Sequence, residues 1–355
     1  MANIVQSTKV YEDWLRTQLS GDVVGKDLER KHEKMRDSPF AFLRATYWRW
    51  AETVLELCPD VANAPPVLAV GDIHLENFGT WRDADGRLVW GVNDFDEAAE
   101  MPYLLDLIRL ATSGMVAGKA AGAKGDQMCA SLLEGYRQGL AAPRPVILDR
   151  DFEWLRELVV VSDKARAKFW KKLENAPEEQ APPRYLKALT AGMPEAGLAL
   201  RTTRRTAGAG SLGRPRWVAT ADWRGAPVVR EAKALLMSNW DKIHATGKTT
   251  IRCGDLAGGR YRAHDPWYRI DDNIVVRRLS PNNRKIEADD DATDLLSAQM
   301  LQAMGLELAN VHLGTADKRQ AIERDLKQRK AGWLQVSAEK MTAAVNGEQK
   351  EWAAA

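Results

Sequence analysis

The first third of the chain changes from a helical to an extended pattern of apolar positions. Apolar residues recur at helical spacing through residues 9–57, and a break at Ser38 predicts the capped start of a helix with a strongly apolar face. Residues 65–70 and 87–92 are short apolar runs of the kind that form buried strands. The Asp85-Gly86 pair just before the second run predicts a tight turn.

The rest of the chain changes character twice. Helices are predicted at residues 104–123, 125–140 and 150–173, followed by a polar break that contains prolines. From residue 201 glycines and β-branched residues become frequent, and strands are predicted at 216–221, 226–232 and 273–279. A helix at 289–315 and a charged helix at 318–355 follow. This order of helices, strands and helices predicts an α+β protein.

Composition adds limits on the possible partners. The 355 residues are 45% hydrophobic and 28% charged, which is typical of a globular chain and not of a disordered one. Lys and Arg number 51 against 49 Asp and Glu, so no general basic field favours a nucleic-acid or membrane partner. Three widely spaced cysteines form no zinc or disulfide pattern and fit a reducing compartment.

No segment has the pattern of a membrane span or a secretion signal. Glu12 and Asp13 lie where a signal peptide needs an apolar core. The most apolar stretch, residues 101–123, is interrupted by Asp106 and Arg109. We therefore expect a cytoplasmic protein without a membrane partner.

An acidic loop directly follows the first predicted strand. Asp72 and Asn77 lie in it with four residues between them, and Asp94-Phe95-Asp96 follows the second strand. Phosphotransferases use this spacing: one Asp orients or deprotonates the acceptor hydroxyl, while the Asn and the second acidic motif hold Mg²⁺ against nucleotide phosphates. Asp and Asn are also common turn formers, but the second acidic motif makes the functional interpretation the stronger one.

Two further residues near this loop are candidates for the site. His74 could ligate a metal or act in the reaction, although a lone histidine more often organises its own loop. Asp106 lies among apolar residues of a predicted helix, so a buried carboxylate there needs hydrogen-bond donors. We expect the backbone of the acidic loop to supply them.

A glycine-rich segment comes much later in the chain. Gly208, Gly210 and Gly213 form a G-x-G-x-x-G motif with Ser211 inside it. A dinucleotide-binding motif would open a helix, but Pro215 and the residues after it continue as a strand. Two strands joined by a glycine hairpin are typical of the lid that kinases place over nucleotide phosphates. Lys233, at the end of the next strand, would pair with those phosphates.

Together these motifs resemble the bacterial family named domain of unknown function 2252, which is usually grouped with protein-kinase-like and aminoglycoside-phosphotransferase-like folds. The resemblance runs from about residue 32 to residue 315, and rests on residues 38–44, 71–79, 93–97, 208–213 and 275–279. It implies a bilobed kinase-like fold that uses ATP and Mg²⁺. Carried over by position, it implies a catalytic role for Asp72, metal-binding roles for Asn77 and Asp94, and a phosphate-binding role for Lys233. The motifs themselves add His74 and Asp106 as catalytic candidates and Asp96 as a metal-binding candidate. Further nucleotide-binding candidates are Gly208, Gly210, Ser211, Gly213 and Asp255.

Two departures from an ordinary kinase stand out. Asp255 falls where relatives have the glutamate that pairs with the lysine, and its shorter side chain leaves that pair in doubt. The acidic loop also precedes the glycine loop, the reverse of the usual order, which predicts a circular permutation. A large helical lobe would then combine residues 1–200 with residues 286–355, and residues 201–285 would form a small antiparallel β-sheet lobe.

The leading hypothesis is an ATP- and Mg²⁺-dependent phosphotransferase acting on a hydroxyl of a small molecule or a protein. Transfer of AMP by a reversed nucleotide and a non-catalytic pseudokinase are the alternatives. The presence of Asp72, Asn77, Asp94 and Lys233 together argues against the pseudokinase. No residue pattern separates phosphoryl from adenylyl transfer.

Overall fold

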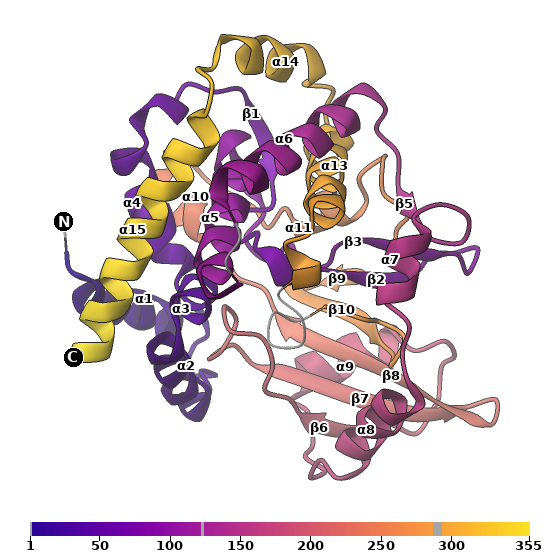
Figure 1. The fold of residues 1–355 in the computed structure, drawn as a ribbon. Helices are drawn as coiled ribbons and strands as arrows, with labels where there is room; N and C mark the ends of the chain where they lie inside the picture. Colours follow the sequence, from indigo (N-terminus) through magenta and orange to yellow (C-terminus); the bar gives the residue numbers. More distant parts are fainter. Residues whose placement is uncertain (1, 122–123, 287–292) are drawn as a thin grey trace.

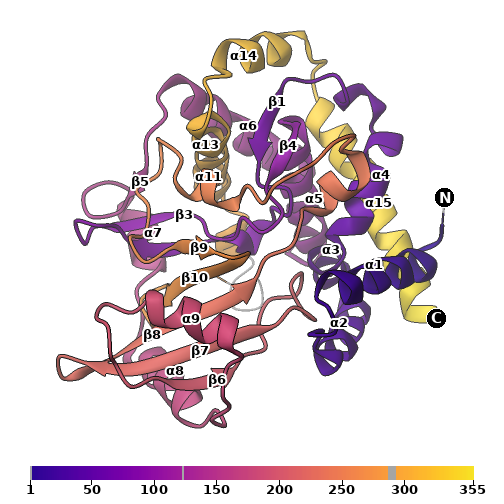
Figure 2. The same ribbon diagram turned by 180° about the vertical axis from the view of Figure 1, so that it is seen from behind.

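The computed structural model describes residues 2–121, 124–286 and 293–355. A five-stranded antiparallel sheet forms one end of the molecule, and most of the helices gather at the other end (Figure 1). Both chain ends lie on one side, where α1 (Ile4–Gln18) contacts α15 (Trp333–Ala354) (Figure 2). The mixed α+β class expected from the sequence is confirmed.

The N-terminal region forms four helices. After α1 come α2 (Gly25–Asp37), α3 (Pro39–Ala45) and α4 (Tyr47–Leu57). The predicted helix start at Ser38 is confirmed, because its side-chain oxygen accepts the Ala41 N–H at 3.1 Å and Pro39 opens α3. Stacking of Tyr11 on Trp48, with ring centroids 3.9 Å apart, joins α1 to α4.

Two small antiparallel sheets follow these helices. Strands β1 (Pro66–Ala69) and β4 (Ala99–Pro102) form one, and β2 (Phe78–Arg82), β3 (Leu88–Val92) and β5 (Val146–Ile147) form the other. Short 3₁₀ turns span Pro59–Val61 and Leu75–Asn77. The predicted turn at Asp85-Gly86 connects β2 to β3. The acidic loop therefore lies between β1 and β2, with Asp94 just after β3.

The central helices match the sequence pattern except in one place. Helices α5 (Leu104–Ala121) and α6 (Gly125–Ala141) agree with it, and residues 122–123 lie outside the described residues. The single helix predicted at 150–173 is wrong, since the structure has α7 (Glu153–Leu158) and α8 (Asp163–Glu174). Three consecutive valines at 159–161 disfavour helix, and Ser162 then caps α8 by accepting the Ala165 N–H.

The large sheet has the order β6-β7-β8-β10-β9. Its strands are β6 (Arg201–Arg204), β7 (Arg216–Trp223), β8 (Ala226–Ala234), β9 (Arg269–Asp271) and β10 (Ile274–Leu279). Helix α9 (Pro183–Ala191) covers one face, where Ala232 and Ala234 share a core with Tyr185 and Leu189. Side chains alternate along a strand, so Glu231 and Lys233 lie on the opposite face.

The remaining helices complete the helical part. They are α10 (Asn239–His244), α11 (Cys253–Ala257), α13 (Ala298–Gly314) and α14 (Arg319–Gln328), followed by α15. The helix predicted from residue 289 has its first residues outside the described part of the chain, and α13 begins after the cap Ser297. Helix α13 packs against α6, and α15 packs along α5 (Figure 1).

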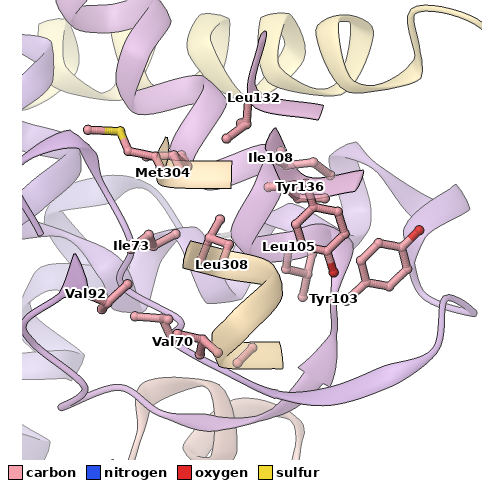
Figure 3. Close-up of a cluster of buried hydrophobic side chains, with 14 of the residues drawn as sticks. Val70, Ile73, Val92, Tyr103, Leu105, Ile108, Leu132, Tyr136, Met304 and Leu308 are labelled. Carbon is pink, nitrogen blue, oxygen red and sulfur yellow. The ribbon is translucent and has the colours of Figure 1, made fainter. Parts of the chain in front are cut away.

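A buried apolar core supports the acidic loop from behind. Val70 and Ile73 on either side of Asp72 pack in the same cluster as Val92 of β3 and as Met304 and Leu308 of α13 (Figure 3). All five are buried. Because helices from both ends of the chain contribute to this core, the position of the loop depends on both.

Two expectations from the sequence concern membrane-spanning helices and disulfide bonds. Within the described residues, no helix has the length and apolar character needed to cross a bilayer. The three cysteines are buried and make no disulfide.

Candidate functional site

A cavity of about 240 Å³ lies between the inner face of the five-stranded sheet and the acidic loop. The loop contributes Asp72 and Asn77, and Asp94 and Asp96 come from the segment after β3. Residues 207–211 of the glycine loop line the same cavity. Motifs that lie more than a hundred positions apart in the sequence therefore share one site.

The acidic loop is held through its backbone by Asp106. The Asp106 carboxylate accepts the Val70 N–H at 2.7 Å and the Gly71 N–H at 2.9 Å, as expected from the sequence. It also bonds to His312 Nε2, 3.1 Å away at the end of α13. Gly71 has φ of +79°, and a Cβ there would lie 2.5 Å from the Glu97 carbonyl oxygen, so only glycine fits this turn. Asp106 is fully buried and does not line the cavity, so it acts as a positioning residue.

Asp72 is oriented by a buried arginine. Arg109 of α5 pairs with Asp72 Oδ1, donates to the Leu43 carbonyl and lies against the ring of Tyr47. Burial raises the pKa of Asp72, and the positive charge of Arg109 opposes that rise. The other carboxylate oxygen faces the glycine loop, since a Cβ on Gly210 would lie 3.0 Å from Asp72 Oδ2. The pair of Arg109 with Asp72, between α5 and the acidic loop, was not expected from the sequence.

Asn77 joins the two acidic segments and leaves one oxygen without a partner. Its amide nitrogen donates to the carbonyls of Asp72 at 3.2 Å and Asp94 at 3.1 Å. Its buried Oδ1 accepts no hydrogen bond from the described residues. Asn77 and Asp94 both line the cavity. An amide oxygen and a carboxylate are a donor set that suits Mg²⁺, which typically takes one or two protein carboxylates and completes its shell with phosphate and water oxygens. Within the described ranges no group of three or more His, Cys, Asp or Glu side chains forms a metal cluster.

Lys233 projects from β8 to the acidic segment after β3. Its Nζ lies 3.3 Å from Asp94 Oδ1 and 2.6 Å from Asp96 Oδ2. Burial alone would raise the pKa of Asp94, but the charge of Lys233 holds that pKa well below its usual range. Burial and the neighbouring Asp94 charge raise the pKa of Asp96. Asp96 therefore serves as the close partner of Lys233, a contact that the sequence did not reveal.

Asp255 is a candidate that the structure does not bring to the site; Gly213 and Lys233 do not line the cavity either, although Lys233 contacts Asp94 and Asp96. Asp255 lies in α11, its side chain is 52% exposed, and it pairs with Arg252 one turn away. It does not line the cavity. The pair between Asp255 and Lys233 considered from the sequence is absent from this arrangement, in which Asp94 and Asp96 hold the lysine.

The glycine loop is a hairpin between β6 and β7, as predicted. Helix α2 and the residue before it hold this loop through two hydrogen bonds. The Val24 N–H donates to the Gly213 carbonyl at 3.1 Å, and Lys31 Nζ donates to the Gly210 carbonyl at 3.1 Å. Lys31 also lies over the ring of Trp48, 4.6 Å from its centroid. Burial lowers the pKa of Lys31 to about 7. No pattern in the sequence indicated that helix α2 reaches this loop.

His74 lines the cavity and also organises its own turn. Its Nδ1 accepts the Glu76 N–H at 3.2 Å, so the proton of the neutral ring lies on Nε2. Burial and the charges of Arg44 and Arg109 hold the pKa of His74 well below its usual range. A neutral ring with this bond agrees with the interpretation that His74 organises its own loop. A role of His74 in the reaction stays a prediction.

Several charged residues of the site had no role assigned from the sequence. Glu97 binds Arg214 at 2.9 Å and accepts the Asn239 N–H at 2.7 Å, which ties the acidic segment to the residues before β7 and α10. Glu231 of β8 is fully buried among arginines of the sheet's inner face. The alternation of polar residues along β8, Glu231 and then Lys233, was the available signal for this polar face.

Comparison with protein families gives a match for about the first half of the chain. Residues 24–192 match the model of a family described as uncharacterized protein conserved in bacteria (DUF2252). The resemblance to this family is thereby confirmed over the segment that carries Asp72, Asn77 and Asp94, while the glycine loop lies beyond the match. Searches of curated proteins and of solved structures found no match.

Proposed function

We propose that this protein is an ATP- and Mg²⁺-dependent phosphotransferase with a circularly permuted, kinase-like fold. The environment of Asn77 is the observation that carries the proposal. Its amide nitrogen fixes the backbone of Asp72 and Asp94, and its oxygen is left without a hydrogen-bond partner in the described residues. Buried polar atoms in folded proteins are nearly always hydrogen-bonded, so an unpartnered oxygen on a residue that lines the cavity with Asp94 supports a bound ligand there.

The residues around the cavity divide the reaction between them. Asp72 would orient the acceptor hydroxyl and accept its proton as the hydroxyl oxygen forms a bond to the γ-phosphorus and the bond to the bridging oxygen of ADP breaks. Lys233 and the glycine loop would hold the phosphates. Mg²⁺, held by Asn77 and Asp94, would neutralise the charge that develops on the phosphoryl oxygens.

The permutation is supported by the way α13 ends. His312 in its last turn bonds to Asp106, and Asp106 holds the backbone of Val70 and Gly71. In a kinase of ordinary order the corresponding helix would lead directly into the catalytic loop. Here the chain instead continues into α14, and the loop comes from the N-terminal part.

The proposal is tested by incubating the protein with ATP and Mg²⁺. ATP turnover is then measured, and the mass of any modified product is determined by mass spectrometry. A phosphorylated product gains about 80 Da and an adenylylated product gains about 329 Da. Asp94→Asn should abolish turnover without loss of the fold, whereas Asp85→Asn at the exposed tip of the β2–β3 hairpin should behave as the wild type. Full turnover by folded Asp94→Asn would refute the assignment.

A further inference from the structure

The inner face of the large sheet carries a cluster of arginines that the phosphotransferase motifs do not use. Arg205 follows β6, Arg216 lies on β7 and Arg277 lies on β10, and all three line the cavity beside Gly208. We call these three residues the arginine wall. Between them Glu231 of β8 is completely buried.

Glu231 orients the wall but does not balance its charge. It lies 3.0 Å from Arg205 Nη1, 3.1 Å from Arg216 Nη1 and 2.7 Å from Arg277 Nε. Three guanidinium groups thus share this one carboxylate, and the carboxylates of Asp94 and Asp96 act electrostatically on Arg277 as well. Glu231 alone leaves the positive charge of the wall in excess. Burial of unbalanced charge is costly, so a purely structural network would be expected to match its charges more closely.

The electrostatics of neighbouring groups report the same excess. Burial lowers the pKa of Arg205, and the charges of Arg216 and Arg277 add to this effect although Glu231 opposes it. Burial, with repulsion from Arg277, lowers the pKa of Lys285 to about 8. Lys285 also lines the cavity. A bound anion would relieve both effects.

The donors that remain on the wall are suited to a phosphoryl group. Arg277 contacts Glu231 through Nε, and no hydrogen bond from its two terminal nitrogens to another described residue occurs. Arg216 Nη2 donates to Ser211 Oγ at 2.7 Å, which joins the wall to the glycine loop. Planar guanidinium groups that are held by a buried carboxylate bind tetrahedral oxyanions with little further loss of side-chain freedom.

From this geometry we propose that the arginine wall is a phosphoryl-binding subsite, distinct from the Lys233 and Asn77–Asp94 positions. This inference rests on the proposed function, because it concerns what the same cavity holds. The phosphoryl group has two possible sources: the phosphate tail of the nucleotide, or a phosphate carried by the acceptor. The subsite therefore narrows the substrates to those that place a phosphate against the inner face of the sheet.

Calorimetric titration of the full chain without metal tests the subsite, with inorganic tripolyphosphate, inorganic phosphate, ATP and adenosine as probes. Wild type should bind tripolyphosphate, with an affinity that falls as ionic strength rises. Arg205→Gln and Arg277→Gln should each weaken that binding about tenfold or more. Arg205 lies on a loop and is 28% exposed, so its replacement should leave the fold intact. Arg204→Gln is the matched control, since this neighbour pairs with Glu179 outside the cavity.

The pattern across probes identifies the source of the phosphoryl group. If Arg205→Gln weakens ATP and tripolyphosphate equally and leaves adenosine unchanged, the wall holds the nucleotide's own phosphates. If Arg205→Gln leaves ATP binding unchanged but abolishes the binding of inorganic phosphate, the wall holds a phosphate of the acceptor. The subsite is refuted if wild type binds neither inorganic probe, or if folded Arg205→Gln and Arg277→Gln bind them as well as Arg204→Gln does.

The same titration separates this inference from the proposed function. Asp94→Asn should not weaken metal-free tripolyphosphate binding, because removing a carboxylate removes repulsion. Failure of the phosphotransferase proposal would appear as absent turnover in wild type with Mg²⁺. Failure of the subsite alone would appear as unchanged tripolyphosphate binding by the two arginine variants, while the wild type still turns over ATP with Mg²⁺.

Discussion

Replacement of Asp106 by asparagine should release the acidic loop from its anchor. The carboxylate accepts three hydrogen bonds, from the N–H groups of Val70 and Gly71 and from His312. Asparagine keeps the shape of the side chain but has one acceptor oxygen, so its NH₂ group must face one of these donors. Hydrogen bonds to a charged group contribute about 1.5–3 kcal/mol each, and a buried donor left unpaired adds a similar cost.

The expected loss is therefore about 3 kcal/mol of folding free energy. In domains of 150–250 residues each kcal/mol moves the melting temperature by about 2–4 °C, so about 3 kcal/mol would correspond to about 6–12 °C. The shift per kcal/mol falls with chain length, and for 355 residues we expect a decrease of roughly 5 °C. ATP turnover should fall further than stability alone explains, because Asp72 and Asn77 follow the released backbone within six residues. Circular dichroism melting and hydrogen exchange of residues 68–79 would measure the two effects.

Asp85→Asn is the matched control, since Asp85 is 79% exposed on the β2–β3 hairpin. A melting temperature of Asp106→Asn within about 1 °C of the wild type, with unchanged exchange of the loop, would refute this account of how the loop is held.

Other predictions concern the lid and the roles within the cavity. Gly210→Val should lower turnover with little change in melting temperature, because any Cβ there meets Asp72 Oδ2 at 3.0 Å; unchanged turnover would contradict the close approach of the lid. Lys233→Met should weaken ATP binding by calorimetry, whereas Asp72→Asn should retain it and lower turnover about 10²–10⁴-fold. If both variants lost ATP binding equally, the assignment of Asp72 as the general base would be refuted. Between the folded pKa of Lys31, about 7, and its usual 10.5, the unfolded chain binds more protons, so this lysine makes stability rise with pH. Lys31→Met should flatten that rise in denaturant titrations at pH 7 and 9, and an unchanged pH dependence would show that the lysine is not buried.

Most helices and strands of the fold could be predicted from local patterns in the sequence. The cap at Ser38, the turn at Asp85-Gly86 and the strand pattern of β7 and β8 depend on neighbours a few residues away, and the structure agrees with each. The helix predicted at 150–173 failed because periodicity alone gives little weight to a short β-branched run followed by a capping serine. Strand β2 was not predicted, and it begins directly after Asn77 of the acidic loop.

The candidate site shows the same division. The support of the loop by Asp106 could be predicted, because a buried acid needs donors and the loop offered them. The partners of the charged groups could not. Arg109 lies one turn from Asp106 yet pairs with Asp72, and Lys233 pairs with Asp96 rather than Asp255, since tertiary packing and not distance along the chain decides which charges meet. The arginine wall joins three separate segments through Glu231, so no single motif contains it.

A crystal structure with a nonhydrolysable ATP analogue and Mg²⁺ tests the central claim most directly. The account predicts Mg²⁺ on Asn77 Oδ1 and the Asp94 carboxylate, with nucleotide phosphates in contact with Lys233 and the glycine loop. A nucleotide bound outside this cavity, or a metal that contacts neither Asn77 nor Asp94, would contradict it.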